Sequence, residues 1–487
     1  MRFLSHMKIR KPFHEKSRVT LKMKTEKHNH CINKLFLPFS ILIVFLCVLY
    51  FDAYLYDTLA YHAPFSALTL NLPIIEGFRF NEGLLDRFQG FPPFWRFALG
   101  PSLIFGLPRL MIIPNILSLS FLLWVLNKTK ILPWKLGIIV LFVFPVTLFS
   151  FRSAYQDFFV GAVLTASFFL ACYSIYFRQK VLLLVSVSTI SLSSLTKYQG
   201  LMQSIVLLFV LLLSLVILGV IKQKPLISSK SYYLIIAFGI SLIMLHPIHN
   251  LVVFSNPFYP IDVGPFRGPE SNYIDSSSYT SVIYPFHGLF NHLLSASELD
   301  WIFRGVVPSY SIDMARSQTQ YGGLLNSVSE VNLIRTGGTY APAYIATMLI
   351  YFIGLQNVLR NTLKSKSLNY RQFAYLAAGI FLFLSSFLPQ SHELRYYLAT
   401  LMILSLTTIS YSIKMYPKIT YFLILTFAIA SLAFNLTQPI YSTFKNGLVY
   451  AFNYPSRDLP NRLDCISYKA DPADRFACQI VLHRNGY

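Results

Sequence analysis

Ionisable side chains lie just outside several apolar stretches of this sequence, and the first such group contains Asp52, Asp57 and His62. A carboxylate in a half-dehydrated site can act as a general base or bind a divalent cation. We therefore expect Asp57 to be a catalytic carboxylate, with His62 lining the same pocket. The alternative is that Asp52 and Asp57 only place negative charge at the start of a helix on the membrane surface, where such charge is favoured.

A second group, Arg152 and Asp157, occupies a turn between two apolar stretches that is too short to be anything but a surface loop. Carboxylates bind metal ions and protons, and arginine binds phosphate. Asp157 is therefore a second candidate catalytic acid and Arg152 a candidate phosphate ligand. The pattern fits equally well a structural ion pair between these two side chains, which at a surface contributes only about 0–1 kcal/mol.

Two further cations, Lys197 and Arg395, follow other apolar stretches on what the charge pattern predicts to be the outer side of a membrane. Cations are scarce on that side, so a local contact is expected to retain them. We expect both to bind phosphate, Arg395 through paired hydrogen bonds. The alternatives are that Lys197 extends to the interface beside Tyr198, and that Arg395 forms an ion pair with Glu393.

The elements that must position these residues are membrane-spanning helices. Of the 487 residues, 54% are hydrophobic and only 13% are charged, whereas soluble proteins are about one-quarter charged. The sequence predicts an all-α polytopic membrane protein with about eleven transmembrane helices and with interfacial helices in its first external loop. Apolar stretches suited to a hydrocarbon layer of about 30 Å occur near residues 35–50, 109–126, 132–149, 158–177, 181–196, 202–221, 232–253, 340–358, 372–388, 397–413 and 419–437.

The net charge of +21 indicates the orientation of these spans. Residues 1–34 are rich in Lys and Arg and contain only Glu15 and Glu26 as acidic residues, which places the N-terminus in the cytoplasm and the C-terminus outside. Nucleic-acid binding is disfavoured, because the cations do not share one soluble face with aromatic residues. The short loops assigned to the cytoplasm contain no carboxylate and carry Lys128, Lys130, Lys135, Arg178, Lys180, Lys222, Lys224, Lys230, Arg360, Lys364, Lys366, Arg371, Lys414 and Lys418.

The chain divides into a basic cytoplasmic segment (1–34), a transmembrane domain (35–437) and an external tail (438–487). Two external loops of the transmembrane domain, 51–108 and 254–339, are long enough to fold. We expect the first to form a pair of helices on the membrane surface, with a turn at 90–95. In the tail, Cys465 and Cys478 are expected to form a disulfide, because they would lie in an oxidising compartment.

The order of these pieces resembles the GT-C class of membrane glycosyltransferases, especially bacterial relatives of the protein O-mannosyltransferases and the lipid A aminoarabinose transferases. The similar segments are 57–64, 195–200 (LTKYQG), 256–260 (NPFYP) and the RYY sequence that begins at Arg395. The resemblance covers roughly residues 35–410 as a pattern of spans and loops. It implies a GT-C-like fold in a bacterial inner membrane.

The resemblance also implies a reaction in which a sugar moves from a polyprenyl-phosphate donor to a glycan, lipid or protein acceptor outside the cytoplasm. Asp57 would be the general base, and Lys197, Arg152 and Arg395 would stabilise the departing phosphate. A single displacement by a hydroxyl group inverts the anomeric centre. A bound Mg²⁺ or Mn²⁺ would use Asp57 and Asp157, although the adjacent acids usual in this class are here separated as Asp52 and Asp57.

Two other functions remain open at this point. An envelope polysaccharide polymerase or ligase would use the large external loop, with Arg267, Arg304, Arg316 and Arg335 as its reactive surface. A flippase or transporter of lipid-linked sugars would need broken helices or ionisable groups at mid-membrane in two repeats, and the sequence shows neither clearly. Soluble-enzyme signatures such as a P-loop or a G-x-S-x-G sequence are absent.

Overall fold

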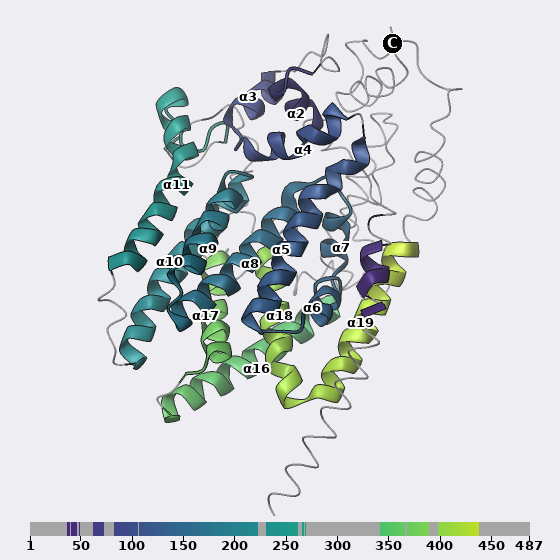
Figure 1. Ribbon diagram of the computed structural model, residues 1–487, viewed down its shortest axis with the longest axis vertical. Coiled ribbons are helices and arrows are strands. Elements are labelled where there is room, and N and C mark those ends of the chain that lie inside the picture. Colours follow the sequence, from purple (N-terminus) through teal and green to yellow (C-terminus); the bar gives the residue numbers. More distant parts are fainter. Residues whose placement is uncertain are drawn as a thin grey trace, which may run out of the picture.

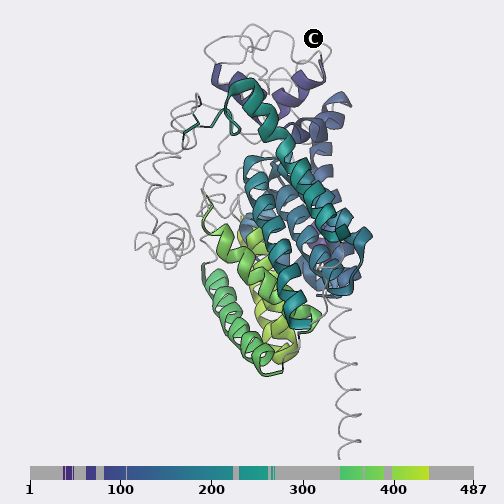
Figure 2. The same ribbon diagram turned by 90° about the vertical axis from the view of Figure 1, so that its left-hand side faces the viewer.

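The computed structural model describes residues 62–72, 82–105, 107–222, 230–261, 341–365, 368–388 and 398–437, together with 37–38, 40–45, 48, 265–266 and 268. This part of the chain is all-helical, with no β-sheet (Figure 1). Its helices run mostly along the long axis of the molecule, and three short helices cover one end of the resulting bundle (Figure 2).

The bundle contains long helices that are joined by short connections. In chain order, its elements are η3 (Pro108–Ile112), α5 (Ile113–Thr129), α6 (Trp134–Leu141), α7 (Pro145–Phe151), α8 (Gln156–Phe177), α9 (Lys180–Ser194), α10 (Tyr198–Lys222), α11 (Lys230–Phe254), α16 (Ala341–Ser365), α17 (Tyr370–Ser385), α18 (Leu398–Met415) and α19 (Pro417–Thr437). The three covering helices, called the cap below, are α2 (Ala63–Thr69), α3 (Glu82–Gly90) and α4 (Phe94–Ile104).

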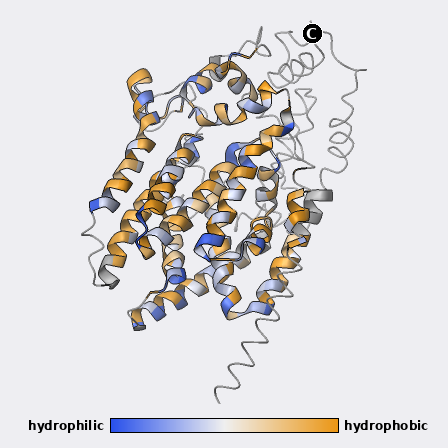
Figure 3. Cartoon of the chain, in the orientation of Figure 1, coloured by the Kyte–Doolittle hydropathy of each residue, from blue (hydrophilic) through white to orange (hydrophobic). Residues whose placement is uncertain are grey.

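Five helical stretches of the described chain are long and apolar enough to cross a membrane: Arg109–Thr129, Gln156–Phe177, Tyr198–Leu218, Lys230–Phe254 and Leu398–Met415. Shorter apolar helices occur at Lys180–Ser194 and Pro417–Ile429. The outer face of α11 presents large apolar side chains, for example Leu234 and Val252, which are 67% and 78% exposed. Apolar residues cover the bundle helices (Figure 3), as expected of a multi-pass membrane protein that faces lipid.

Helix α8 is the centre of the bundle. Nearly all of its membrane-length stretch is buried inside the protein, because α5, α9, α10, α17 and α18 all pack around it. At its first turns, Phe158 contacts Phe151 of α7 with ring centroids 4.8 Å apart. The position of α8 fixes where its polar N-terminal residues lie, and these belong to the candidate site.

The predicted span at 132–149 is two short helices, α6 and α7, rather than one. Pro145 begins α7, and a proline cannot donate the backbone hydrogen bond that would continue α6 through this point. The chain bends at residues 142–144, and neither helix alone has the length of about 20 residues needed to cross a bilayer.

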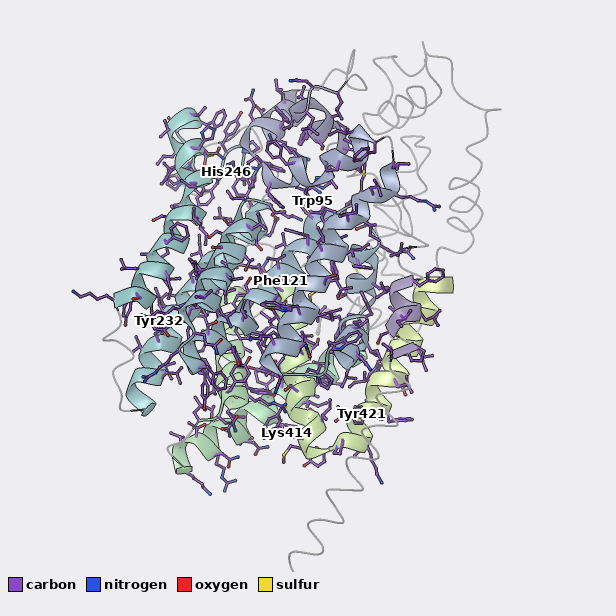
Figure 4. All side chains as sticks on the ribbon, in the orientation of Figure 1. Trp95, Phe121, Tyr232, His246, Lys414 and Tyr421 are labelled. Atoms are coloured by element: carbon purple, nitrogen blue, oxygen red, sulfur yellow. The ribbon has the colours of Figure 1, made fainter. Side chains whose placement is uncertain are left out.

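The cation-rich loops gather at the end of the bundle opposite the cap. Lys414 and Tyr421 lie toward this end, whereas Trp95 and His246 lie at the cap end (Figure 4). Hydrogen bonds join these loops to one another: Arg371 Nη2 to Lys130 O at 2.9 Å, Tyr176 Oη to Leu368 O at 2.9 Å, Lys180 Nζ to Ser231 Oγ at 3.1 Å and Ser410 Oγ to Ile131 O at 2.6 Å.

The cap differs from the predicted pair of surface helices by its third helix, α4. Pro93 precedes α4 directly, and the predicted turn at 90–95 is shorter than expected because the helix already begins at Phe94. Helices α2 and α4 pack closely: Ser66 Oγ donates to the carbonyl of Arg96 at 2.5 Å, and Gly100 faces Leu70. A side chain larger than hydrogen at Gly100 would meet Leu70 Cδ1 at 2.5 Å.

Candidate active site

Asp157 stands in the first turn of α8, at the cap end of the bundle, and only 4% of its side chain is exposed. Tyr155 is the N-terminal flanking residue of the helix, and its side chain does not cap it. A carboxylate in a first turn interacts favourably with the unpaired N–H groups and the positive end of the helix dipole. The helix start thus lowers the cost of burying this negative charge.

Lys197 is the partner of Asp157. It lies in the short connection between α9 and α10, and its Nζ donates to Asp157 Oδ1 at 2.5 Å. Its side chain is 15% exposed. The end of α9 favours a cation, whereas the start of α10, directly after Lys197, does not, so the ion pair with Asp157 is what compensates this charge. The structure therefore brings together two residues that the sequence predicted as site residues separately, one at the start of α8 and one just after the end of α9.

Arg152 and His62 lie in the same region. Arg152 follows α7 in the turn that leads to Asp157, and both Arg152 and His62 are 8% exposed. The His62 ring, immediately before α2, lies 6.2 Å from the ring of Tyr155 in this turn. Of the predicted site residues, Asp157 and Lys197 are therefore in direct contact, Arg152 lies in the turn that leads to Asp157, and His62 lies at the start of the cap beside Tyr155 of that turn.

Asn115 of α5 holds the α7–α8 turn and was missed by sequence reasoning. Its Nδ2 donates to the carbonyls of Phe151 at 3.0 Å and Ser153 at 2.9 Å, and the residue is fully buried. These bonds satisfy carbonyl groups that the end of α7 leaves without helical partners. An asparagine within an otherwise apolar span was the available signal, because polar groups inside a membrane helix are costly.

The carbonyl of Gly90 fastens the cap to the bundle. It accepts hydrogen bonds from Tyr198 Oη at 2.8 Å, His246 Nε2 at 2.8 Å and Asn250 Nδ2 at 2.9 Å. Because a carbonyl oxygen only accepts, His246 carries its proton on Nε2. A β-carbon at Gly90 would lie 2.4 Å from the carbonyl oxygen of Tyr259, so the close approach needs glycine here.

Two further contacts hold the cap over the site. The backbone N–H of Phe94 donates to the carbonyl of Leu195 at 2.9 Å, only two residues before Lys197. Phe94 also stacks on Phe159 of α8 with ring centroids 5.6 Å apart. The start of α4 is therefore fixed against the two helix ends that carry Asp157 and Lys197.

The 256–260 segment (NPFYP) forms a turn that contributes to the same attachment. Asn256 Nδ2 donates to Ile261 O at 2.9 Å, and Asn256 Oδ1 accepts from the N–H of Phe258 at 2.8 Å. Tyr259 Oη donates to Asp86 Oδ1 of α3 at 2.5 Å. His246 is buried, and its ring bonds to the Gly90 carbonyl.

Arg96 of α4 is a half-buried cation in the cap that sequence reasoning also missed. Its Nη2 donates to Phe91 O at 2.7 Å, and its guanidinium lies 4.4 Å from the ring centroid of Phe88. Burial lowers the pKa of Arg96 to about 10, so the side chain remains charged at neutral pH. Arg96 therefore adds a positive charge within the cap itself.

Asp52, Asp57, Arg395, Cys465 and Cys478 fall outside the residues that the structure describes. Within the described ranges, no group of three or more His, Cys, Asp and Glu side chains could hold a metal ion. Asp157 Oδ1 is an oxygen that a metal ion would use, but here it accepts a hydrogen bond from the Lys197 ammonium group. The described residues therefore fit a divalent cation poorly.

Comparison with models of known protein families, with curated proteins and with solved structures finds no match for this chain.

Proposed function

We propose that this protein is a membrane glycosyltransferase that takes a sugar from a polyprenyl-phosphate donor outside the cytoplasm. The observation that carries the proposal is the buried Asp157–Lys197 pair beneath the cap, with Arg152 in the adjoining turn. Buried ionisable groups at one end of a membrane bundle are expensive to keep and favour a functional role. The resemblance of the sequence to the GT-C class selects this chemistry.

The distribution of cations supports the side of the membrane on which the reaction is placed. The loops rich in Lys and Arg gather at the end opposite the cap, and cytoplasmic loops hold such residues. The cap and the Asp157–Lys197 pair then belong to the external side. We further propose about eleven crossings, a cytoplasmic N-terminus, an external C-terminal tail and a location in a bacterial inner membrane.

The residues beneath the cap suit the departing phosphate. Transfer leaves negative charge on the phosphate, and cations already held in place stabilise that charge most effectively. Lys197 and Arg152 supply such cations, and Arg395 is proposed as a third. Asp157 holds the Lys197 ammonium group in position, so we assign Asp157 a positioning role before a catalytic one.

The acceptor hydroxyl needs a base, and Asp57 is the proposed one, with His62 beside it. Asp57 precedes His62 closely in the chain, and His62 lies at the start of the cap beside Tyr155. A hydroxyl that attacks directly inverts the anomeric carbon, with polyprenyl phosphate as the leaving group. These residues do not specify the sugar or the acceptor, because all polyprenyl-phosphate donors share the phosphate that they would bind.

The proposal is tested by incubating the purified protein in lipid nanodiscs with a panel of radiolabelled polyprenyl-phosphate sugars and candidate acceptors. We expect label to leave one donor and appear in product, with free polyprenyl phosphate formed in equal amount. Movement of an intact donor across a vesicle membrane without bond cleavage would contradict the proposal and favour a transporter. Elongation of a lipid-linked glycan by whole repeat units would contradict it in favour of a polymerase.

A further inference from the structure

Chain segments on both sides of Lys197 are bonded to the cap. The carbonyl of Leu195, two positions before Lys197, accepts from the backbone N–H of Phe94 at 2.9 Å. The hydroxyl group of Tyr198, the next residue after Lys197, donates to the carbonyl of Gly90 at 2.8 Å. Gly90 ends α3 and Phe94 begins α4, so one short turn of the cap holds the chain before and after Lys197.

The attachment at Tyr198 belongs to a buried polar network. Tyr198 is 4% exposed, and its hydroxyl oxygen also lies 2.5 Å from the carbonyl oxygen of Tyr259 and accepts from Asn250 Nδ2 at 2.8 Å. A hydroxyl group has one proton, so the carbonyls of Gly90 and Tyr259 share it. Opening the attachment inside this network leaves polar groups unpaired, which is costly.

The same turn of the cap also packs against the start of α8, where Asp157 lies. The rings of Phe94 and Trp95 both contact Phe159, two residues after Asp157, with ring centroids 5.6 and 5.7 Å away. The ion pair between Asp157 and Lys197 therefore joins two helix ends that both contact the start of α4. A displacement of the cap would remove contacts from both ends at once.

We propose that Tyr198 is a positioning residue for Lys197, and that attachment of the cap at Gly90 stabilises the contact between Lys197 and Asp157. In the attached state the α9–α10 connection is held before and after Lys197, so the ammonium group stays within reach of the carboxylate. When the cap detaches, the connection loses these restraints and Lys197 spends more time away from Asp157. The coupling is reciprocal, so a ligand that binds Lys197 in this position also stabilises the attached cap. The consequence for the donor phosphate rests on the proposed function, whereas the coupling itself does not.

The test is the rate at which the Lys197 amine of the full-length protein, in lipid nanodiscs, reacts with an amine-specific acylating reagent, measured by peptide mass spectrometry. The side chain is ion-paired and only 15% exposed, so a low rate is expected for the wild type. Tyr198→Phe should raise the rate about fivefold, the factor that corresponds to about 1 kcal/mol for one lost hydrogen bond. Gly90→Ala changes only the cap and should raise the rate at least as much, because its β-carbon would lie 2.4 Å from the carbonyl oxygen of Tyr259.

Each variant has a matched control. Tyr232→Phe removes a buried hydroxyl group of α11 that has no hydrogen-bond partner in the described chain. Gly100→Ala adds the same methyl group within the cap, where the nearest atom belongs to Leu70 at the end of α2. Both controls should leave the Lys197 rate unchanged. The exposed Lys180, at the opposite end of the bundle, should react equally in all variants.

Equal Lys197 rates in the wild type, Tyr198→Phe and Gly90→Ala would overturn the proposal, as would an equal rise in the two controls. A rise in Tyr198→Phe alone would also overturn it, because the effect would then be local to α10. If Gly90→Ala does not fold, Asn250→Leu takes its place, since it removes another hydrogen bond to the Gly90 carbonyl from a different helix.

Hydrogen exchange in the presence of polyprenyl phosphate tests the consequence for the donor. Binding should slow amide exchange in residues 82–105 of the cap. A wild-type protein that binds no polyprenyl phosphate would contradict the proposed function alone, because the Lys197 rates are measured without it. Bound polyprenyl phosphate with unchanged exchange in the cap would contradict the link between the cap and the donor site.

Discussion

Asp157 and Lys197 each lower the free-energy cost of burying the other's charge. Burying one ion alone costs several kcal/mol, and the pair recovers this only through close contact and the favourable start of α8. The local sequence allowed two other arrangements. Asp157 could pair with Arg152, and Lys197 could extend to the membrane interface beside Tyr198. The actual partners come from different helices, 40 residues apart, and no periodicity in the sequence indicates which residues face each other across a bundle.

Removing one member of the pair should destabilise the protein more than removing both. We expect Asp157→Asn or Lys197→Gln to lower the free energy of unfolding by about 3 kcal/mol, because each leaves a buried charge without its partner. The double variant should lose clearly less than the sum of the two. Thermal unfolding of the four proteins in one detergent measures this coupling, and strictly additive losses would show that the two side chains do not interact.

Asp57 is the proposed general base, and its role can be tested independently of the Asp157–Lys197 pair. Asp57→Asn keeps the shape of the side chain and removes its ability to accept a proton. We expect this variant to insert and to bind donor normally, while its transfer rate falls by about 10²-fold or more, the usual scale for a positioned base. Asp52→Asn is the matched control and should lose much less. A wild-type rate in Asp57→Asn would transfer the assignment to Asp157.

At the scale of elements, the long helices were predictable and their polar connections were not. The predicted spans at 158–177 and 232–253 correspond to α8 and α11 within a few residues, because a long apolar stretch permits little besides a membrane helix. Helix α4, the bend before Pro145 and the Gly90 attachment were missed. They depend on contacts between distant segments, such as Phe94 with Leu195, that have no local sequence signal.

The attachment of the cap through Gly90 is testable with a pair of tyrosine variants. Tyr198→Phe removes a hydroxyl group that bonds to the Gly90 carbonyl, whereas Tyr232→Phe removes a buried hydroxyl group without a hydrogen-bond partner in the described chain. We expect Tyr198→Phe to cost about 1 kcal/mol and to speed amide hydrogen exchange in residues 82–105. Tyr232→Phe should leave both unchanged. Equal effects would mean that the cap is not held by this bond.

For the whole molecule, the charge pattern predicts on which side of the membrane each loop lies, which composition alone does not. Apolar composition alone indicates a membrane protein, and five helices of the described chain meet the length and hydropathy needed to span. Among the described cations that the sequence assigned to one side, Arg371, Lys130 and Lys180 take part in hydrogen bonds that join neighbouring loops at one end. The sequence placed Asp57 and Arg395 on the other side as well, but both fall outside the described residues, so their relation to Lys197 stays a prediction.

The orientation is tested by single cysteines labelled from outside intact cells with a membrane-impermeant maleimide, in a background without native cysteines. Lys180→Cys, in the cation-rich loops, should remain unlabelled, because cytoplasmic loops collect such residues. Gln89→Cys, in the cap, should react. Labelling at Lys180 with protection at Gln89 would invert the topology and place the Asp157–Lys197 pair at the cytoplasmic side.

The affinity for a polyprenyl-phosphate donor in the absence of acceptor tests the central claim most directly. The Asp157→Asn/Lys197→Gln double variant removes the candidate phosphate ligand without leaving an isolated buried charge, and Lys180→Gln removes one cation from the opposite end of the bundle. We predict a loss of about tenfold or more in donor affinity for the double variant, equivalent to about 1.4 kcal/mol, and none for Lys180→Gln. Unchanged donor affinity in a folded double variant would contradict the assignment of this buried pair to the donor site.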